Sequence, residues 1–203
     1  MKRDRAVAAP PPEPGLLARL AFPLAALAVL LCAFLLAAFP ARSDDLFMHL
    51  AAGRAWFEEG RFPNPDPWLF SIPDYDRGWI DLAYWGTHLG LTALHRLGGF
   101  ELVVVVKALL VVLGAAAPLW LARRLGARSF LVPAAALLGL WAASNRFIER
   151  GSLVSDCLGP WVLALVLAEL ARPSRQRWLV TLVLAEWKNE HPGVLVGLEF
   201  VLG

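Results

Sequence analysis

Long apolar runs separated by short polar loops dominate the pattern of this 203-residue chain. The stretch from Leu20 to Phe39 holds no charged residue and has about the 20 residues that a membrane span needs. The apolar core of a cleaved signal peptide is only about 7–15 residues long, so we interpret residues 16–39 as a retained first transmembrane helix. Further apolar runs cover residues 100–122, 129–143, 153–171 and 178–203. The pattern therefore predicts an all-α, polytopic helical membrane protein with about five spans.

Residues 40–99, between the first two runs, form a polar loop with helical periodicity of its own. A first helix is expected between an N-cap at Ser43 or Asp44 and a stop at Gly60. Four prolines follow and exclude a long helix there. Residues 79–97 then carry a polar stripe at helical spacing, which is typical of a helix that lies in the membrane interface. We expect this loop to be external and to hold amphipathic juxtamembrane helices.

The two ends of the chain differ from its middle. Residues 1–15 are basic, rich in proline and without an apolar period, and we expect a disordered cytoplasmic tail. At the other end the sequence stops at Gly203 inside an apolar run, without a cap or a polar tail. We therefore expect residues 100–203 to be a helical membrane bundle that is truncated at its C-terminus.

Composition supports a membrane protein and excludes several other classes. The chain is 58% hydrophobic and 18% charged, whereas a soluble domain is usually about 45–50% apolar and roughly 25% charged. A net charge of +2 gives no basic field for a polyanion, so no nucleic-acid partner is expected. Cys32 and Cys157 lie in apolar runs without a second ligand at metal-binding spacing, so we interpret both as small buried hydrophobic residues.

Arginines in short loops indicate the orientation. The N-terminal tail and the loops 123–128 and 172–177 are basic, and the positive-inside rule places all three in the cytoplasm. This arrangement is self-consistent only if residues 79–97 do not cross the membrane. Three polar segments then lie on the outer face, namely 40–99, 144–152 and 188–193. If residues 79–97 do cross, this convergence is lost.

Polar residues of the converging segments are candidates for substrate binding, although a solvated loop surface also explains such residues. The candidates are Asp81, His88, Glu149, Arg150, Lys188 and His191. Lys107 lies inside the second apolar run, where a charge costs about 2.5–3.5 kcal/mol at the centre of a span. We expect it to extend outward or to pair with an acid in a cavity.

Two segments resemble a known family. DDLFMHLAAGRAWFEEGRFPNPDPWLFSIP, followed by GWIDLAYW, resembles the first outer loop of bacterial GT-C-type membrane glycosyltransferases. Members of this kind begin the loop with Asp-Leu-aromatic-x-His-x-x-x-Gly and continue through Asp-Pro-aromatic-Ser to a Trp-rich helix. The later WKNEHPGVLVGL is similar to their Trp-x-Asn-x-His-Gly-Gly-x-x-x-Gly segment. The resemblance covers the N-terminal portion of a family whose members are normally much longer.

The resemblance implies transfer of a sugar from a polyprenyl-phosphate donor at the outer face of the bacterial cytoplasmic membrane. It places the catalytic carboxylate at Asp45, with Asp44 beside it and His49 one helical turn later. A carboxylate there can act as a general base on an acceptor hydroxyl, or Asp45 can hold a divalent cation. Without the resemblance, helix capping is the favoured explanation of both aspartates.

The sequence also departs from the family pattern. Position 83 is Ala where a His or Glu is expected, and HPG replaces His-Gly-Gly at residues 191–193. A non-catalytic or truncated paralogue, or an assembly subunit, is therefore the alternative function. A transporter is disfavoured, because the sequence has no internal repeat and its ionisable residues gather at one face.

Overall fold

The computed structural model describes residues 15–68, 71–72, 74–76, 78–174 and 178–202. No residue of these ranges lies in a β-strand, so the prediction of an all-α protein is confirmed. The helical elements are α1 (Leu16–Ala37), α2 (Asp44–Glu59), α3 (Gly78–Arg124), α4 (Leu131–Ala143), the 3-10 turn η1 (Ser144–Arg146), α5 (Ser152–Ala171), α6 (Trp178–Glu190) and α7 (Val194–Leu202).

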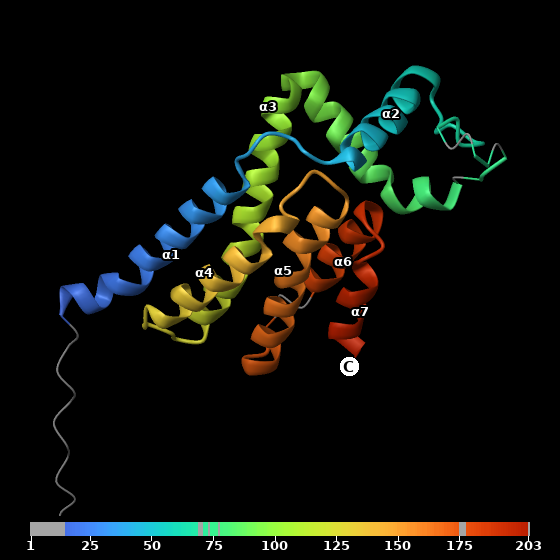
Figure 1. The fold of residues 1–203 in the computed structure, drawn as a ribbon. Coiled ribbons are helices and arrows are strands. Elements are labelled where there is room, and N and C mark those ends of the chain that lie inside the picture. Colours follow the sequence, from blue (N-terminus) through green and yellow to red (C-terminus); the bar gives the residue numbers. More distant parts are fainter. Residues whose placement is uncertain (1–14, 69–70, 73, 77, 175–177, 203) are drawn as a thin grey trace, which may run out of the picture.

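The longest helix, α3, is two helices joined at a sharp bend. Gly98 and Gly99 have non-helical backbone angles, and the φ of +64° at Gly99 is a conformation that favours glycine. The first half of α3 lies with α2 at one end of the molecule, and the second half runs back between α1 and α5 (Figure 1). The expected helix at residues 79–97 is present. Because of the bend, its axis differs in direction from that of the apolar segment that follows.

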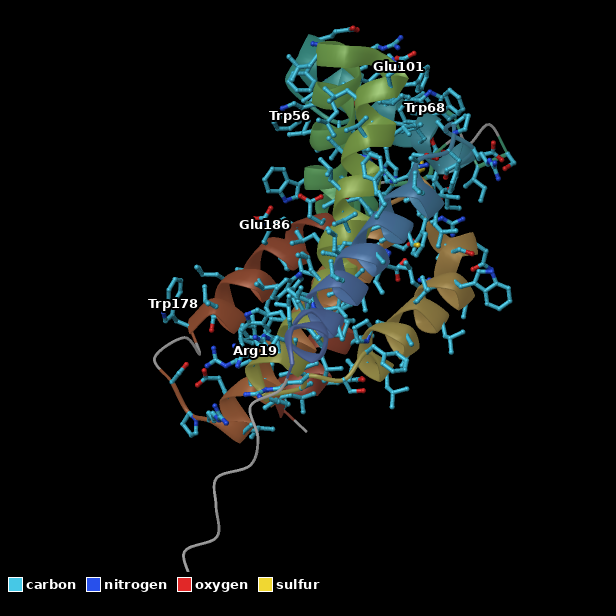
Figure 2. All side chains as sticks on the ribbon, turned by 90° about the vertical axis from the view of Figure 1, so that its left-hand side faces the viewer. Arg19, Trp56, Trp68, Glu101, Trp178 and Glu186 are labelled. Carbon is cyan, nitrogen blue, oxygen red and sulfur yellow. The ribbon has the colours of Figure 1, made fainter. Side chains whose placement is uncertain are left out.

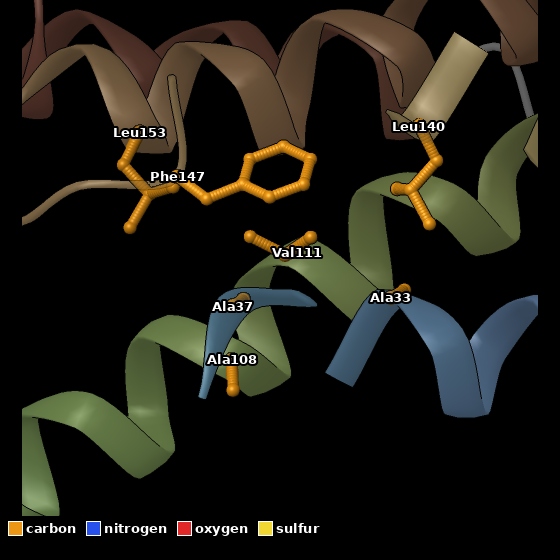
Figure 3. Packing of buried hydrophobic residues seen from close by; sticks show 7 residues of the cluster. All are labelled: Ala33, Ala37, Ala108, Val111, Leu140, Phe147 and Leu153. Carbon is orange, nitrogen blue, oxygen red and sulfur yellow. The ribbon is translucent and has the colours of Figure 1, made fainter. Parts of the chain in front are cut away.

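Small side chains allow α1 and α3 to approach closely. Ala33 and Ala37 of α1 are fully buried against Ala108 and Val111 of α3 (Figure 3). Leu140, Phe147 and Leu153 complete this core cluster from α4, the loop before α5, and α5. A second apolar cluster joins α5, α6 and α7, and a third attaches α2 to α3. The second half of α3 is therefore the central helix of the bundle.

Within the described residues, three helices are long and apolar enough to cross a membrane: Arg19–Ala37, Ala83–Arg124 and Ser152–Ala171. This is two fewer than the five spans predicted. α4 has 13 residues, or about 20 Å at 1.5 Å per residue, against a hydrocarbon core of about 30 Å. The last apolar run is divided, because α6 ends after 13 residues and α7 starts anew at Val194. The three long helices are compatible with an integral membrane protein.

Helix α2 lies where the sequence predicts it. Ser43 is the N-cap residue, and Gly60 ends the helix in the left-handed conformation with a φ of +73°. Leu46 and Leu50 bury the inner face of α2 against Val103 of α3. The first helix is slightly shorter than predicted, since α1 ends at Ala37 rather than at residue 39.

Arginines from three helices lie toward one end of the bundle. Arg19 lies near the start of α1, and Arg123 at the end of α3 stacks over the Phe22 ring of α1 at 6.0 Å. Arg172 follows the end of α5. Arg19 lies at the end of the molecule opposite Glu101, which follows the α3 bend (Figure 2). We name these the arginine end and, after the helix that covers it, the α2 end.

Candidate functional site

Three segments that are far apart in the sequence meet at the α2 end. The backbone before α2 contacts the loop between η1 and α5 through Glu149. The first half of α3 contacts the end of α6, where Thr87 Oγ1 donates to the backbone oxygen of Glu190 at 2.9 Å. Tyr84 of α3 also packs edge-on against His191, with ring centroids 5.4 Å apart. These are the same three segments that the arginine distribution places together.

A buried ion pair joins these segments to the central helix. Lys107 Nζ lies 2.5 Å from Glu149 Oε1, and the side chains are 1% and 0% exposed. The ammonium also donates to the backbone oxygen of Phe39 at 3.0 Å and lies 3.6 Å from the centre of the Phe39 aromatic ring. Lys107 therefore pairs with an acid, one of the two arrangements expected, and it fixes the chain between α1 and α2.

Glu149 is a structural acceptor with few sites left for a ligand. Its second oxygen accepts from the backbone N–H of Arg42 at 3.0 Å and of Ser43 at 3.4 Å. Burial acts to raise the pKa of this carboxyl, but the hydrogen bonds from Lys107 and the Arg42 N–H outweigh it and hold the pKa below its usual value. Glu149 is therefore ionised at neutral pH and secures the start of α2.

Asp45 is accessible, in contrast to Glu149. Its side chain is 53% exposed, and its Oδ2 lies 3.7 Å from Arg150 Nε. Neither Asp45 nor Asp44 is the cap residue of α2, because both lie in its first turn and Ser43 is the N-cap. Both carboxylates still lie beside the positive end of the helix dipole. Asp45 and Arg150 therefore place one negative and one positive side chain at the surface of the α2 end.

His49 and His88 form a buried contact between α2 and α3. Their Nδ1 atoms lie 2.8 Å apart, and the residues are 2% and 0% exposed. A hydrogen bond between these atoms requires one nitrogen to donate and the other to accept. Tyr84 packs beside both rings, at centroid distances of 5.8 and 6.3 Å. His49 thus lies one turn beyond Asp45 but inside the protein, where it holds α2 in place.

The other predicted residues are less closely associated. Lys188 is exposed near the end of α6, and the side chain of Asp81 lies outside the described residues. One cavity of about 140 Å³ is lined by Lys107, Glu149 and Arg150 among others, and another of about 520 Å³ is lined by His191. Within the described ranges, no three His, Cys, Asp or Glu side chains are grouped so as to hold a metal ion.

Comparison with protein-family models, curated proteins and solved structures finds no match to this chain. The candidate site is therefore described by its own geometry.

The structure also brings together residues that are not among the predicted site residues. Tyr84 connects the two buried histidines with His191, and Ser155 and Trp187 hydrogen-bond at the break between α6 and α7. Arg146 forms a two-point ion pair with Asp156, at 3.0 and 3.3 Å. No local sequence pattern marks these residues as a group, and only the fold brings them together.

Proposed function

We propose that this protein is an integral membrane glycosyltransferase that transfers a sugar from a polyprenyl-phosphate donor at the outer face of the bacterial cytoplasmic membrane. Two features support the proposal. The sequence of the first loop resembles that of GT-C-type enzymes, and the loop lies at the end of the bundle where two later polar segments join it. The partners are accordingly the lipid bilayer and a lipid-linked sugar donor.

The arginine end is the cytoplasmic side in this proposal, with the N-terminus inside the cell. Its support is the common location of Arg19, Arg123 and Arg172 away from α2. The short helices α4 and α6 lie within the membrane as partners of the long helices, which completes five passes. Exposed Leu138 and Trp141 on α4 then face lipid.

The observation that carries the proposal is the exposed Asp45 beside Arg150 at the start of α2. Asp45 accepts the proton of an acceptor hydroxyl, whose oxygen attacks the anomeric carbon of the sugar. The bond from that carbon to the phosphate oxygen breaks, and polyprenyl phosphate leaves with the electron pair. Arg150 neutralises the charge on the leaving phosphate. His49 and Glu149, which are buried, position α2 and do not contact substrate.

A divalent cation is a further component that the resemblance allows, with Asp45 as its ligand. The described side chains supply no group of three ligands around this carboxylate. We therefore derive no step of the reaction through a metal.

The test compares Asp45→Asn with Asp44→Asn in the purified protein. Release of polyprenyl phosphate from a radiolabelled polyprenyl-phosphate sugar should fall by roughly 10²–10⁴-fold in Asp45→Asn, because Asn keeps the size of the side chain but cannot act as a base. Asp44→Asn should cost much less, since Asp44 does not pair with Arg150. Equal melting temperatures would show that neither change unfolds the protein. Near-normal turnover by Asp45→Asn would remove this residue from the mechanism.

A non-catalytic subunit is the second candidate, and one observation favours it. Four ionisable residues at the α2 end are buried in internal pairs, namely Lys107 with Glu149 and His49 with His88. Wild-type protein that releases no polyprenyl phosphate from any of a panel of such donors would support this function over the enzyme.

A further inference from the structure

His191 is held by two hydrogen bonds to the same ring nitrogen. The backbone N–H of Gly193 donates to His191 Nδ1 at 2.8 Å, and Ser155 Oγ lies 2.7 Å from that atom. Trp187 Nε1–H donates to Ser155 Oγ at 2.7 Å. Trp187 and His191 are four residues apart, so one serine of α5 contacts both at the end of α6.

The direction of each hydrogen bond in this chain is fixed by chemistry. A backbone N–H and an indole N–H can only donate. Because the Gly193 N–H donates to His191 Nδ1, that nitrogen acts as an acceptor, and the Ser155 hydroxyl, which accepts from Trp187, must donate its own proton to it. Because His191 Nδ1 accepts from both Ser155 and Gly193, it carries no proton, and the neutral ring must carry its proton on Nε2.

We propose that Ser155 and Trp187 are positioning residues that hold His191 as the neutral Nε2–H tautomer, so that His191 acts as a hydrogen-bond donor and not as a base. The role of His191 toward a substrate rests on the proposed transferase function. The tautomer itself does not depend on that function.

The surroundings of His191 support this assignment. The ring packs edge-on against Tyr84, and the charged neighbours are Asp156 and Arg146, which are paired with each other. Burial lowers the pKa of His191 below its usual value; Asp156 acts in the opposite direction and Arg146 in the same direction. The neutral ring therefore persists at pH 7.

The same geometry argues against Ser155 as an activated nucleophile. A histidine base would have to take the serine proton onto Nδ1. That protonation would turn Nδ1 from an acceptor into a donor and would oppose the Gly193 N–H. His191 also lines the cavity of about 520 Å³ between α5, α6 and α7, together with Arg146 and Ser152. In this proposal the ring's one N–H, on Nε2, donates to a ligand oxygen bound in that cavity.

The test is ¹⁵N NMR of histidine-labelled full-length protein in lipid nanodiscs, with the His191 signals assigned by their loss in His191→Asn. Wild-type His191 should show an unprotonated Nδ1 and a protonated Nε2 at pH 7. Ser155→Ala removes one of two bonds to Nδ1 and should raise the fraction with a proton on Nδ1 by roughly fivefold. Trp187→Phe should have a smaller effect in the same direction, because the serine hydroxyl remains.

Ser152→Ala is the matched control, since Ser152 lies one turn earlier on α5 and lines the same cavity. It should leave the His191 spectrum unchanged. A proton on Nδ1 in the wild-type protein, or an unchanged tautomer in Ser155→Ala, would overturn the proposal.

Activity provides an independent arm of the test. His191→Asn keeps an N–H donor, whereas His191→Ala keeps none. If His191 is a donor, the Asn variant should turn over at least tenfold faster than the Ala variant. Equal loss in both variants would refute the donor role. The NMR result requires no donor substrate, so its failure is distinguishable from a failure of the transferase proposal.

Discussion

The substitution Glu149→Gln tests whether a buried charge holds the α2 end together. Gln has the same shape but removes the charge that Lys107 and two backbone N–H groups share. Removing one partner of a buried ion pair typically costs about 3–5 kcal/mol, because the other charge is left uncompensated. We expect a loss of this size in the free energy of unfolding. The double variant Lys107→Met/Glu149→Gln should recover part of it, because no buried charge remains.

Two measurements check this prediction in detergent micelles. Equilibrium unfolding of the two single variants and the double variant gives the coupling energy between the residues. Amide hydrogen exchange should show faster exchange at Arg42 and Ser43 in Glu149→Gln, since their N–H groups lose a charged acceptor. A loss below about 1 kcal/mol together with additive effects would refute the structural role of the pair.

Other changes test separate parts of the molecule. Gly53→Ala should cost about 1–3 kcal/mol of stability, because a Cβ there would collide with Thr92 and with the backbone of α3. Gly90→Ala is the control: a Cβ there meets open space, so the change should be neutral or slightly stabilising. Thermal unfolding measures both effects. The pKa of Glu149 is lower in the folded state than its value of about 4.5 in the unfolded chain. The ionised carboxylate therefore contributes fully to the free energy of unfolding above about pH 4.5, and this contribution is lost as the pH falls through the folded-state pKa. The melting temperature should therefore fall more steeply below about pH 4.5 in wild type than in Glu149→Gln. A cysteine at Ser129 should react with an impermeant thiol reagent only after permeabilisation of the cell, and reaction in intact cells would reverse the topology.

Local signals explain which parts of the fold are predictable. The bounds of α2 agree with the signals at Ser43 and Gly60: Gly60 ends the helix in the left-handed conformation, and Ser43 occupies the N-cap position without a side-chain hydrogen bond to the first turn. The apolar runs predict the long helices in the same way. Fewer helices than the five predicted spans are long enough to cross a membrane, because hydropathy does not reveal where an apolar run begins or stops as a helix. α4 covers only 13 residues, and the chain breaks between α6 and α7 at His191.

The candidate site is less predictable, because its contacts join distant residues. Polar loop positions indicate that Glu149 is of interest, but they do not reveal its partner Lys107, which is 42 residues away. Nor does any periodic signal connect Ser155 with His191, 36 residues apart. The sequence also does not reveal which polar residues of one helix are exposed: Asp45 is accessible, whereas His49, one turn later, is buried.

The most direct test of the central claim is labelling of Asp44→Cys in a background without Cys32 and Cys157. Asp44 is exposed beside Asp45, at the end of the bundle that we assign to the outer face. In intact cells an impermeant thiol reagent should label this cysteine, and a polyprenyl-phosphate sugar added first should slow the labelling. Labelling that requires permeabilisation, or that the donor does not slow, would contradict an outward-facing site for a lipid-linked sugar.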